Sequence, residues 1–143
     1  MSDYAQSSRA QLIERIKALE KATLDTQQLS EREREVAEAA LRDSAERLRA
    51  MQREQVRLAE LFASWVKAHP EWELVAPQRF SLVCFRRLGS DEENEQILER
   101  ANRSGEMFLS HTKLDGRYVM RLAIGNARTT EADVRRAWEV LNG

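Results

Sequence analysis

The feature that most constrains this chain is a stretch of about 60 residues, from Ser8 to His69, that contains neither proline nor glycine. These two residues interrupt helices most strongly, so the whole stretch is predicted to be helical. A single α-helix of about 60 residues, rising about 1.5 Å per residue, would be roughly 90 Å long. Capping-box patterns at Ser8 and Ser30 leave two alternatives: one long helix that begins at Ser8, or two helices that meet near Leu29.

The second half of this stretch has the spacing of a coiled coil. Small, apolar or weakly polar residues recur at alternating intervals of four and three. They are Ala37, Leu41, Ser44, Leu48, Met51, Gln55, Leu58, Phe62 and Trp65. Because a lone helix of this length cannot bury such a stripe, it needs a partner helix. We therefore expect a homo-oligomer held by the N-terminal helix.

The strongest turn signal is the Asp-Gly pair at 115–116, which lies between two runs of alternating side chains. If these residues form a two-residue hairpin loop, Leu114 pairs with Arg117 and Ser110 pairs with Arg121. The second strand, expected over residues 117–126, then sends an apolar set of side chains to one face, which must be covered. That set is Tyr118, Met120, Leu122 and Ile124. The opposite face carries the charged guanidinium of Arg121.

Further signals fill the segment between the long helix and this hairpin. The pair at 69–70, His-Pro, ends the helix. Residues 71–74 form either a short strand or a connector, and residues 80–87 form a strand rich in β-formers. Ser90 and Thr130 are the N-caps of two more helices.

This order of elements predicts an α+β fold. The expected architecture is a long N-terminal coiled-coil helix, followed by a small antiparallel sheet with helices packed on one face. We divide the chain into a helical extension, residues 1–45, and a domain, residues 46–143. No element is left to cover the second sheet face, so we expect that open face to contact another protein surface.

The composition argues against several kinds of partner. The net charge is −1 and neither part of the chain is strongly polarised, so we expect no nucleic acid. There is no apolar run of the length that a membrane helix needs, so we expect no membrane contact. The single cysteine, Cys84, fits a reducing compartment, and the cytoplasm is the expected location.

Side chains that commonly carry catalysis are sparse. The two histidines, His69 and His111, are expected to be structural, and Cys84 is expected to be a small residue of the core. No spacing of His, Cys and acidic residues predicts a metal site, and no glycine-rich loop predicts a phosphate site. For Arg121 two interpretations stay open: a salt bridge on an open sheet face, or contact with an anion in a larger assembly.

Three strings of residues carry a resemblance to a known family. They are LVCFR at 82–86, FLSHT at 108–112 and RLAIGN-x-RTT at 121–130, and they occur in the family's order. With them, the segment from about Glu46 to Asn142 resembles the C-terminal small domain of the pyridoxal-phosphate-dependent group II decarboxylases. This is the family of the aromatic-L-amino-acid decarboxylases, and the resemblance covers about two thirds of the chain.

The resemblance implies that this chain is not an enzyme by itself. The family holds pyridoxal phosphate (PLP) as a Schiff base on a lysine that follows a histidine, in a large domain. Here Lys17, Lys21, Lys67 and Lys113 do not follow a histidine, so we expect no cofactor and no catalytic residue in this chain. In glutamate-decarboxylating members, the arginine that matches Arg121 binds a substrate carboxylate, which makes Arg121 the candidate site residue.

Residues 1–45 resemble, more weakly, the helical linkers that join domains in bacterial signalling proteins. Two functional hypotheses follow. The first is an isolated or fused C-terminal domain of a PLP-dependent aromatic amino-acid decarboxylase, which is not catalytic alone. The alternative is a coiled-coil oligomerisation module or signalling linker that carries this domain.

Overall fold

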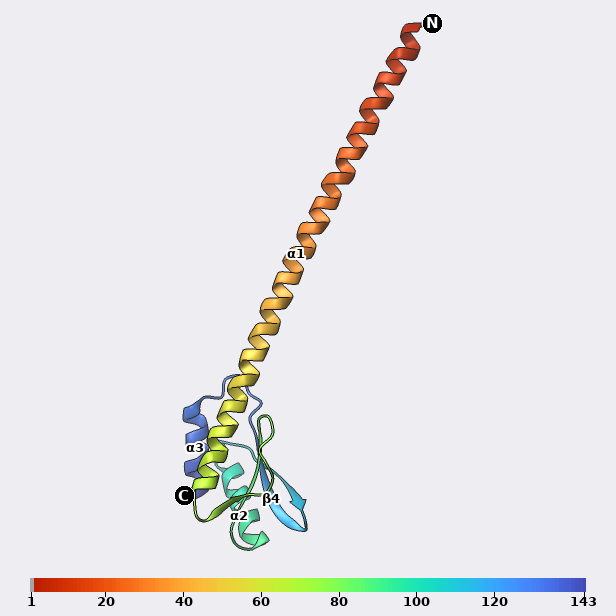
Figure 1. The fold of residues 1–143 in the computed structure, drawn as a ribbon. Helices are drawn as coiled ribbons and strands as arrows, with labels where there is room; N and C mark the ends of the chain where they lie inside the picture. The colour runs from red at the N-terminus through yellow and green to blue at the C-terminus, as the bar shows by residue number, and fades with distance from the viewer. Residues whose placement is uncertain (1) are drawn as a thin grey trace. The chain divides into compact units, whose positions relative to one another are not determined.

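The computed structural model describes residues 2–143, with side chains described from Gln6 onward. Its elements in chain order are α1 (Ser2–Ala68), β1 (Trp72–Leu74), β2 (Leu82–Arg87), α2 (Asp91–Arg103), β3 (Ser110–Leu114), β4 (Arg117–Ala123) and α3 (Glu131–Asn142) (Figure 1). The chain divides into two compact units, one that ends at Arg47 and one that runs from Leu48 to Gly143. This is the expected α+β class, and each unit is described by itself below.

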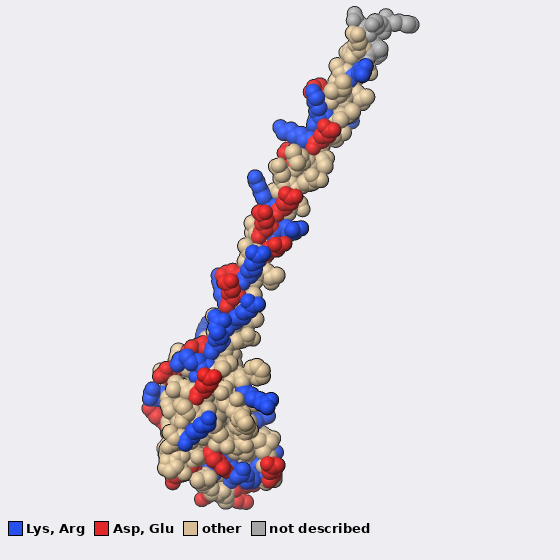
Figure 2. Space-filling view, in the orientation of Figure 1, with Lys and Arg blue, Asp and Glu red and all other residues tan. Residues whose placement is uncertain are grey.

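The described part of the first unit, from Ser2 onward, is helical throughout. The long stretch without proline or glycine forms one helix, α1, and not two helices that meet near Leu29. The helix begins at Ser2, so the predicted start at Ser8 is wrong. A capping box favours a helix start but does not stop a helix from continuing, since no proline or glycine precedes it. Figure 2 shows basic and acidic side chains interleaved along this unit.

The second unit is built on a four-stranded antiparallel sheet with the strand order β1-β2-β4-β3. The predicted hairpin register is confirmed, since Leu114 pairs with Arg117 and Ser110 pairs with Arg121. Both loop residues have positive φ, 50° at Asp115 and 75° at Gly116, as a two-residue type I′ turn requires. Strand β4 is shorter than expected and ends at Ala123.

The apolar face of the sheet is covered by α2, α3 and the last turns of α1, and Figure 1 shows α3 beside those turns. Phe62 of α1 is the centre of this core, with ring centroids 5.0 Å from Phe85 and 5.6 Å from Trp138. Leu58 and Phe62 are both 0% exposed within their own unit. Assigning these two positions to a seam between chains was therefore wrong. The heptad spacing was real, but its last turns pack against the sheet of the same chain.

Helix α2 is held to the sheet by two asparagine side chains. Asn94 is fully buried: its Oδ1 accepts from the backbone N–H of Arg87, and its Nδ2 donates to the Arg87 carbonyl, at 2.8 and 3.0 Å. Two turns later, Asn102 makes the same pair of bonds with the N–H and the carbonyl of Leu109. Each amide thus takes the place of a neighbouring strand at a point where the ladder has ended.

Candidate functional site: the open sheet face and the adjoining cavity

Arg121, the site residue expected from the sequence, lies half-buried on the sheet face that no helix covers. Its Nε donates to Ser110 Oγ at 3.1 Å, and its backbone partner on β2 is Cys84. Over residues 6–143, no carboxylate lies within ion-pair distance of this guanidinium. Of the two interpretations left open, an internal salt bridge is therefore excluded for this part of the chain.

Exposed apolar side chains surround Arg121. Leu82 pairs with Ala123, and both are exposed, while Phe108 just before β3 is 79% exposed. We call Leu82, Phe108, Arg121 and Ala123 the open-face patch. Exposed apolar groups gathered around a charge are typical of a surface that meets another surface.

The other end of the same face is closed by a charge network. The ladder, extended by one residue, sets Arg86 beside Val119, and both side chains are buried. Arg86 donates to the Gly89 carbonyl at 2.7 Å and to Asp91 Oδ1 at 3.3 Å, and lies 3.8 Å from Glu73. A buried guanidinium needs partners of this kind. The face is therefore open around Arg121 and closed around Val119. Alternation along the strand did not predict this difference.

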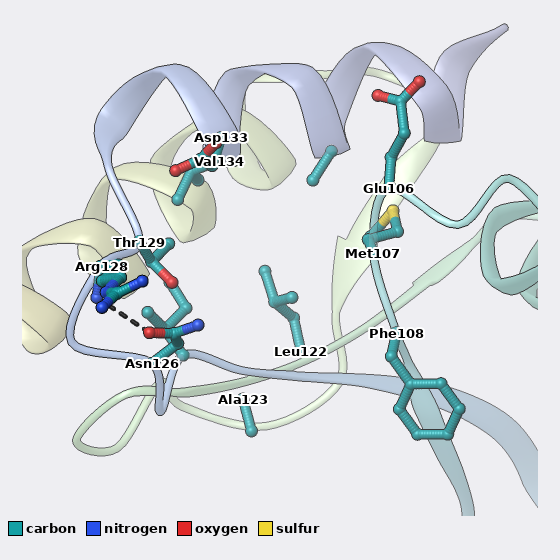
Figure 3. A pocket seen from close by; sticks show the side chains of 12 residues that line it. Glu106, Met107, Phe108, Leu122, Ala123, Asn126, Arg128, Thr129, Asp133 and Val134 are labelled. Carbon is teal, nitrogen blue, oxygen red and sulfur yellow. Dashed lines mark hydrogen bonds between the residues drawn. The ribbon is translucent and has the colours of Figure 1, made fainter.

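A cavity of about 390 Å³ adjoins the patch, between β4 and α3. Figure 3 shows Leu122 and Val134 directed into the cavity. Phe108 and Ala123, which belong to the open-face patch, point away from it. Its polar rim consists of Glu106, Asn126, Arg128, Thr129 and Asp133. Sequence reasoning missed this rim. The only signal was the clustering of polar residues in the loop between the last strand and the last helix.

The two carboxylates of this rim keep their charge at neutral pH. The backbone N–H and the hydroxyl of Thr130 both bond the Asp133 carboxylate, which lowers its pKa. A hydrogen bond from Arg136 lowers the pKa of Glu106 in the same way. With Arg128 beside them, the rim carries both signs of charge, and it does not select an anion or a cation by charge alone.

The described residues place no lysine in the cavity and bring no metal-ligating side chains together. All four lysines, Lys17, Lys21, Lys67 and Lys113, are exposed, and none lines the cavity. A Schiff-base lysine would need to lie inside a formed pocket. Among the described residues, no group of three or more His, Cys, Asp and Glu side chains is suited to hold a metal ion.

The remaining candidates take structural positions. His69 accepts from the backbone N–H of Glu71 and packs edge-on against Trp138. His111 is exposed and stacks on Tyr118 with ring centroids 4.8 Å apart. Cys84 is a half-buried free thiol outside the core, so its assignment as a core residue was wrong: alternation along β2 turns its side chain to the face opposite Val83 and Phe85. No helix of the described chain has the length and apolarity of a membrane span.

Known proteins provide an independent comparison. No family model matches the chain. It is 37% identical over 95 residues to the aromatic-L-amino-acid decarboxylase of Catharanthus roseus, which covers 62% of this chain and 19% of that protein. It is 39% identical over 104 residues to the phenylacetaldehyde synthase of Arabidopsis thaliana, which covers 68% of this chain and 21% of that protein.

Solved structures agree with the sequence matches. The tryptophan decarboxylase of Catharanthus roseus in complex with L-tryptophan superposes with a TM-score of 0.63 and 37% identity, over 66% of this chain and 22% of that one. The chain spans about a fifth of the length of the curated relatives it matches, so it corresponds to a part of such an enzyme. Over about two thirds of its length, this chain is therefore homologous to plant aromatic amino-acid decarboxylases.

Proposed function

We propose that residues 48–143 serve as the C-terminal small domain of a PLP-dependent aromatic amino-acid decarboxylase, and that this chain alone is not catalytic. The observation that supports this most directly is the open-face patch. In a domain homologous to part of a larger enzyme, an uncovered sheet face with a half-buried arginine is suited to meet the rest of that enzyme. The positions of the four lysines support the second half of the proposal.

Arg121 has the role of an anion contact in this proposal. A guanidinium has five N–H donors, and within residues 6–143 only the Nε of Arg121 has a protein acceptor, the hydroxyl of Ser110. Ser110 fixes the direction of the group, and its two terminal nitrogens are left to bind a carboxylate in bidentate fashion. That carboxylate belongs either to an amino-acid substrate or to a facing protein surface.

A chimaera tests the small-domain proposal. The matching segment of the Catharanthus roseus tryptophan decarboxylase is replaced by residues 48–143 of this chain, and carbon dioxide release from L-tryptophan is measured. We expect the chimaera to keep bound PLP and measurable activity, while the same enzyme with the segment deleted has neither. A soluble, PLP-loaded chimaera without activity would contradict the proposal.

The chain itself tests the absence of independent catalysis. When the purified protein is mixed with PLP, we expect no visible absorption band of a lysine Schiff base, and no carbon dioxide release above a heat-treated control. A stable band that survives gel filtration would mean that one of the four exposed lysines lies in a site that the structure does not reveal. The cytoplasmic location and the resemblance of residues 1–45 to signalling linkers stay predictions.

A further inference from the structure

The first unit leaves a row of large aliphatic side chains in solvent. Leu12, Ile13, Ile16 and Leu19 are 60, 44, 48 and 62% exposed. They lie within little more than two helical turns, which is unusual for a helix face that has no partner. This cluster is distinct from the part of α1 that packs into the core of the second unit.

These residues start a seam with regular spacing. From Leu12 onward, intervals of four and three lead through five further positions, which are Ile16, Leu19, Thr23, Thr26 and Ser30. One extra interval of four, at Arg34, then brings the same seam to Ala37, Leu41 and Ser44. Such an insertion is a stutter, which coiled coils accommodate by local unwinding. The middle of the seam is therefore polar, with Arg34 at its one break in heptad spacing.

The polar middle is compatible with burial. The hydroxyl of Thr23 donates to the Leu19 carbonyl at 2.9 Å, and the hydroxyl of Thr26 donates to the Ala22 carbonyl at 2.8 Å. Because each hydroxyl is bonded within its own helix, the threonine methyl groups can pack against a partner without leaving an unsatisfied donor.

The charges beside this seam identify the partner. With Leu12 and Leu19 at d positions and Ile16 at an a position, Arg15 occupies a g position and Glu20 the following e position. Both side chains are exposed, and within residues 6–143 neither forms an ion pair. In a parallel, in-register pair of identical helices, Arg15 of each copy faces Glu20 of the other. An antiparallel pair would bring g positions to g positions, and this match would be lost.

We propose that residues 12–44 pair with the same residues of a second copy of this chain, as a parallel, in-register, two-stranded coiled coil. The seam supplies the contact, and the reciprocal Arg15–Glu20 pairs set the orientation. This proposal is independent of the decarboxylase proposal, because it rests on the first unit only.

The seam is tested with one substitution on it and a matched one away from it. Sedimentation equilibrium of the full chain is compared with Ile16→Glu and with Ala18→Glu, which places the same charge on the opposite, exposed face of α1. We expect a dimer, weakened at least about tenfold by Ile16→Glu and about twofold or less by Ala18→Glu. A chain that is monomeric at about 100 μM would overturn the proposal and assign this face to a different protein. Equal effects of the two variants would overturn it as well.

The orientation is tested by charge exchange and by cross-linking. Arg15→Glu and Glu20→Arg should each weaken the dimer, and the double variant should restore it; a double variant as weak as either single one would overturn the parallel register. In a Cys84→Ser background, Leu19→Cys should form a disulfide between copies under mild oxidation, because an in-register seam brings these two positions together. A dimer that forms no such disulfide is not in register and contradicts the proposal.

Discussion

Replacing Asn94 by alanine removes the side chain that holds the end of β2 to α2. In this variant the N–H of Arg87 loses its partner at 2.8 Å, and the Arg87 carbonyl loses the bond from Asn94 Nδ2 at 3.0 Å but keeps one from Arg86 Nε at 3.4 Å. The Ser90 carbonyl loses one bond from Asn94 Nδ2 but keeps its bond from the Asn94 backbone N–H at 3.3 Å. The loss is therefore counted on the Arg87 N–H, with a smaller share for the Arg87 carbonyl.

The magnitude follows from this count. A buried backbone group without a partner costs about 1–3 kcal/mol, and alanine returns up to about 0.7 kcal/mol through its higher helix propensity. We expect Asn94→Ala to lower the free energy of unfolding of the second unit by about 1–3 kcal/mol. Gln96→Ala, on the exposed face of the same helix, is the matched control and should change it by less than about 0.5 kcal/mol.

Urea unfolding followed by tryptophan fluorescence measures the effect. All three tryptophans, Trp65, Trp72 and Trp138, lie in the second unit, so the signal reports that unit and not the N-terminal helix. If Asn94→Ala proves as stable as Gln96→Ala, water or a backbone shift satisfies the Arg87 N–H. The asparagine would then not be the structural link described above.

Three further substitutions test the turn, the open face and the acid response. Arg121→Ala should lower the free energy of unfolding by less than about 1 kcal/mol, because the half-buried side chain makes one hydrogen bond, to Ser110; a loss of several kcal/mol would make Arg121 an internal support. Gly116→Ala should cost about 1–2 kcal/mol in the same assay, since φ is 75° there, and an unchanged stability would contradict the turn geometry. Thr130 lowers the pKa of Asp133, so the stabilisation is complete above the ordinary aspartate value of 3.8 and is lost as the pH falls through the lowered pKa. Asp133→Asn should therefore flatten the acid part of the stability profile, and an unchanged slope would show that the cap does not hold the carboxylate.

The hairpin was predictable because its information is local. Asp115 and Gly116 specify a turn by their own backbone preferences, and alternation then sets the register of Ser110 opposite Arg121. The N-caps at Ser90 and Thr130 are local in the same sense, and both capping boxes are formed. Features of this kind depend on neighbours within a few residues.

The sequence did not predict in the same way which element packs against an apolar stripe. Leu58 and Phe62 continue the heptad spacing of Leu41, but they pack into a core whose other half comes from residues far along the chain. Periodicity states that a face must be covered and does not state by what. The role of Asn94 was not predictable from local pattern either, because it depends on where β2 and β4 diverge.

The uncovered face of the sheet was predictable in part, since it depends on local alternation and on long-range packing. Alternation placed Arg121 correctly on the uncovered face. It placed Val119 on that face too, although the Val119 side chain is fully buried. The difference arises from Arg86, whose buried guanidinium is held by Asp91 and the Gly89 carbonyl. These partners lie within five positions of Arg86, but Arg86 comes to lie beside Val119 only when β2 pairs with β4, so alternation along β4 alone did not predict the burial of Val119.

The side-chain bonds of α2 also decide which amide protons exchange together. The amides of Arg87, Leu109 and Tyr118 donate to side chains of α2 and not to a neighbouring strand. They belong to three different parts of the sheet, yet each can meet deuterated solvent only when α2 moves away. Their hydrogen-exchange rates should therefore report the opening of α2. The neighbouring amides that bond another strand should exchange only when the strands separate.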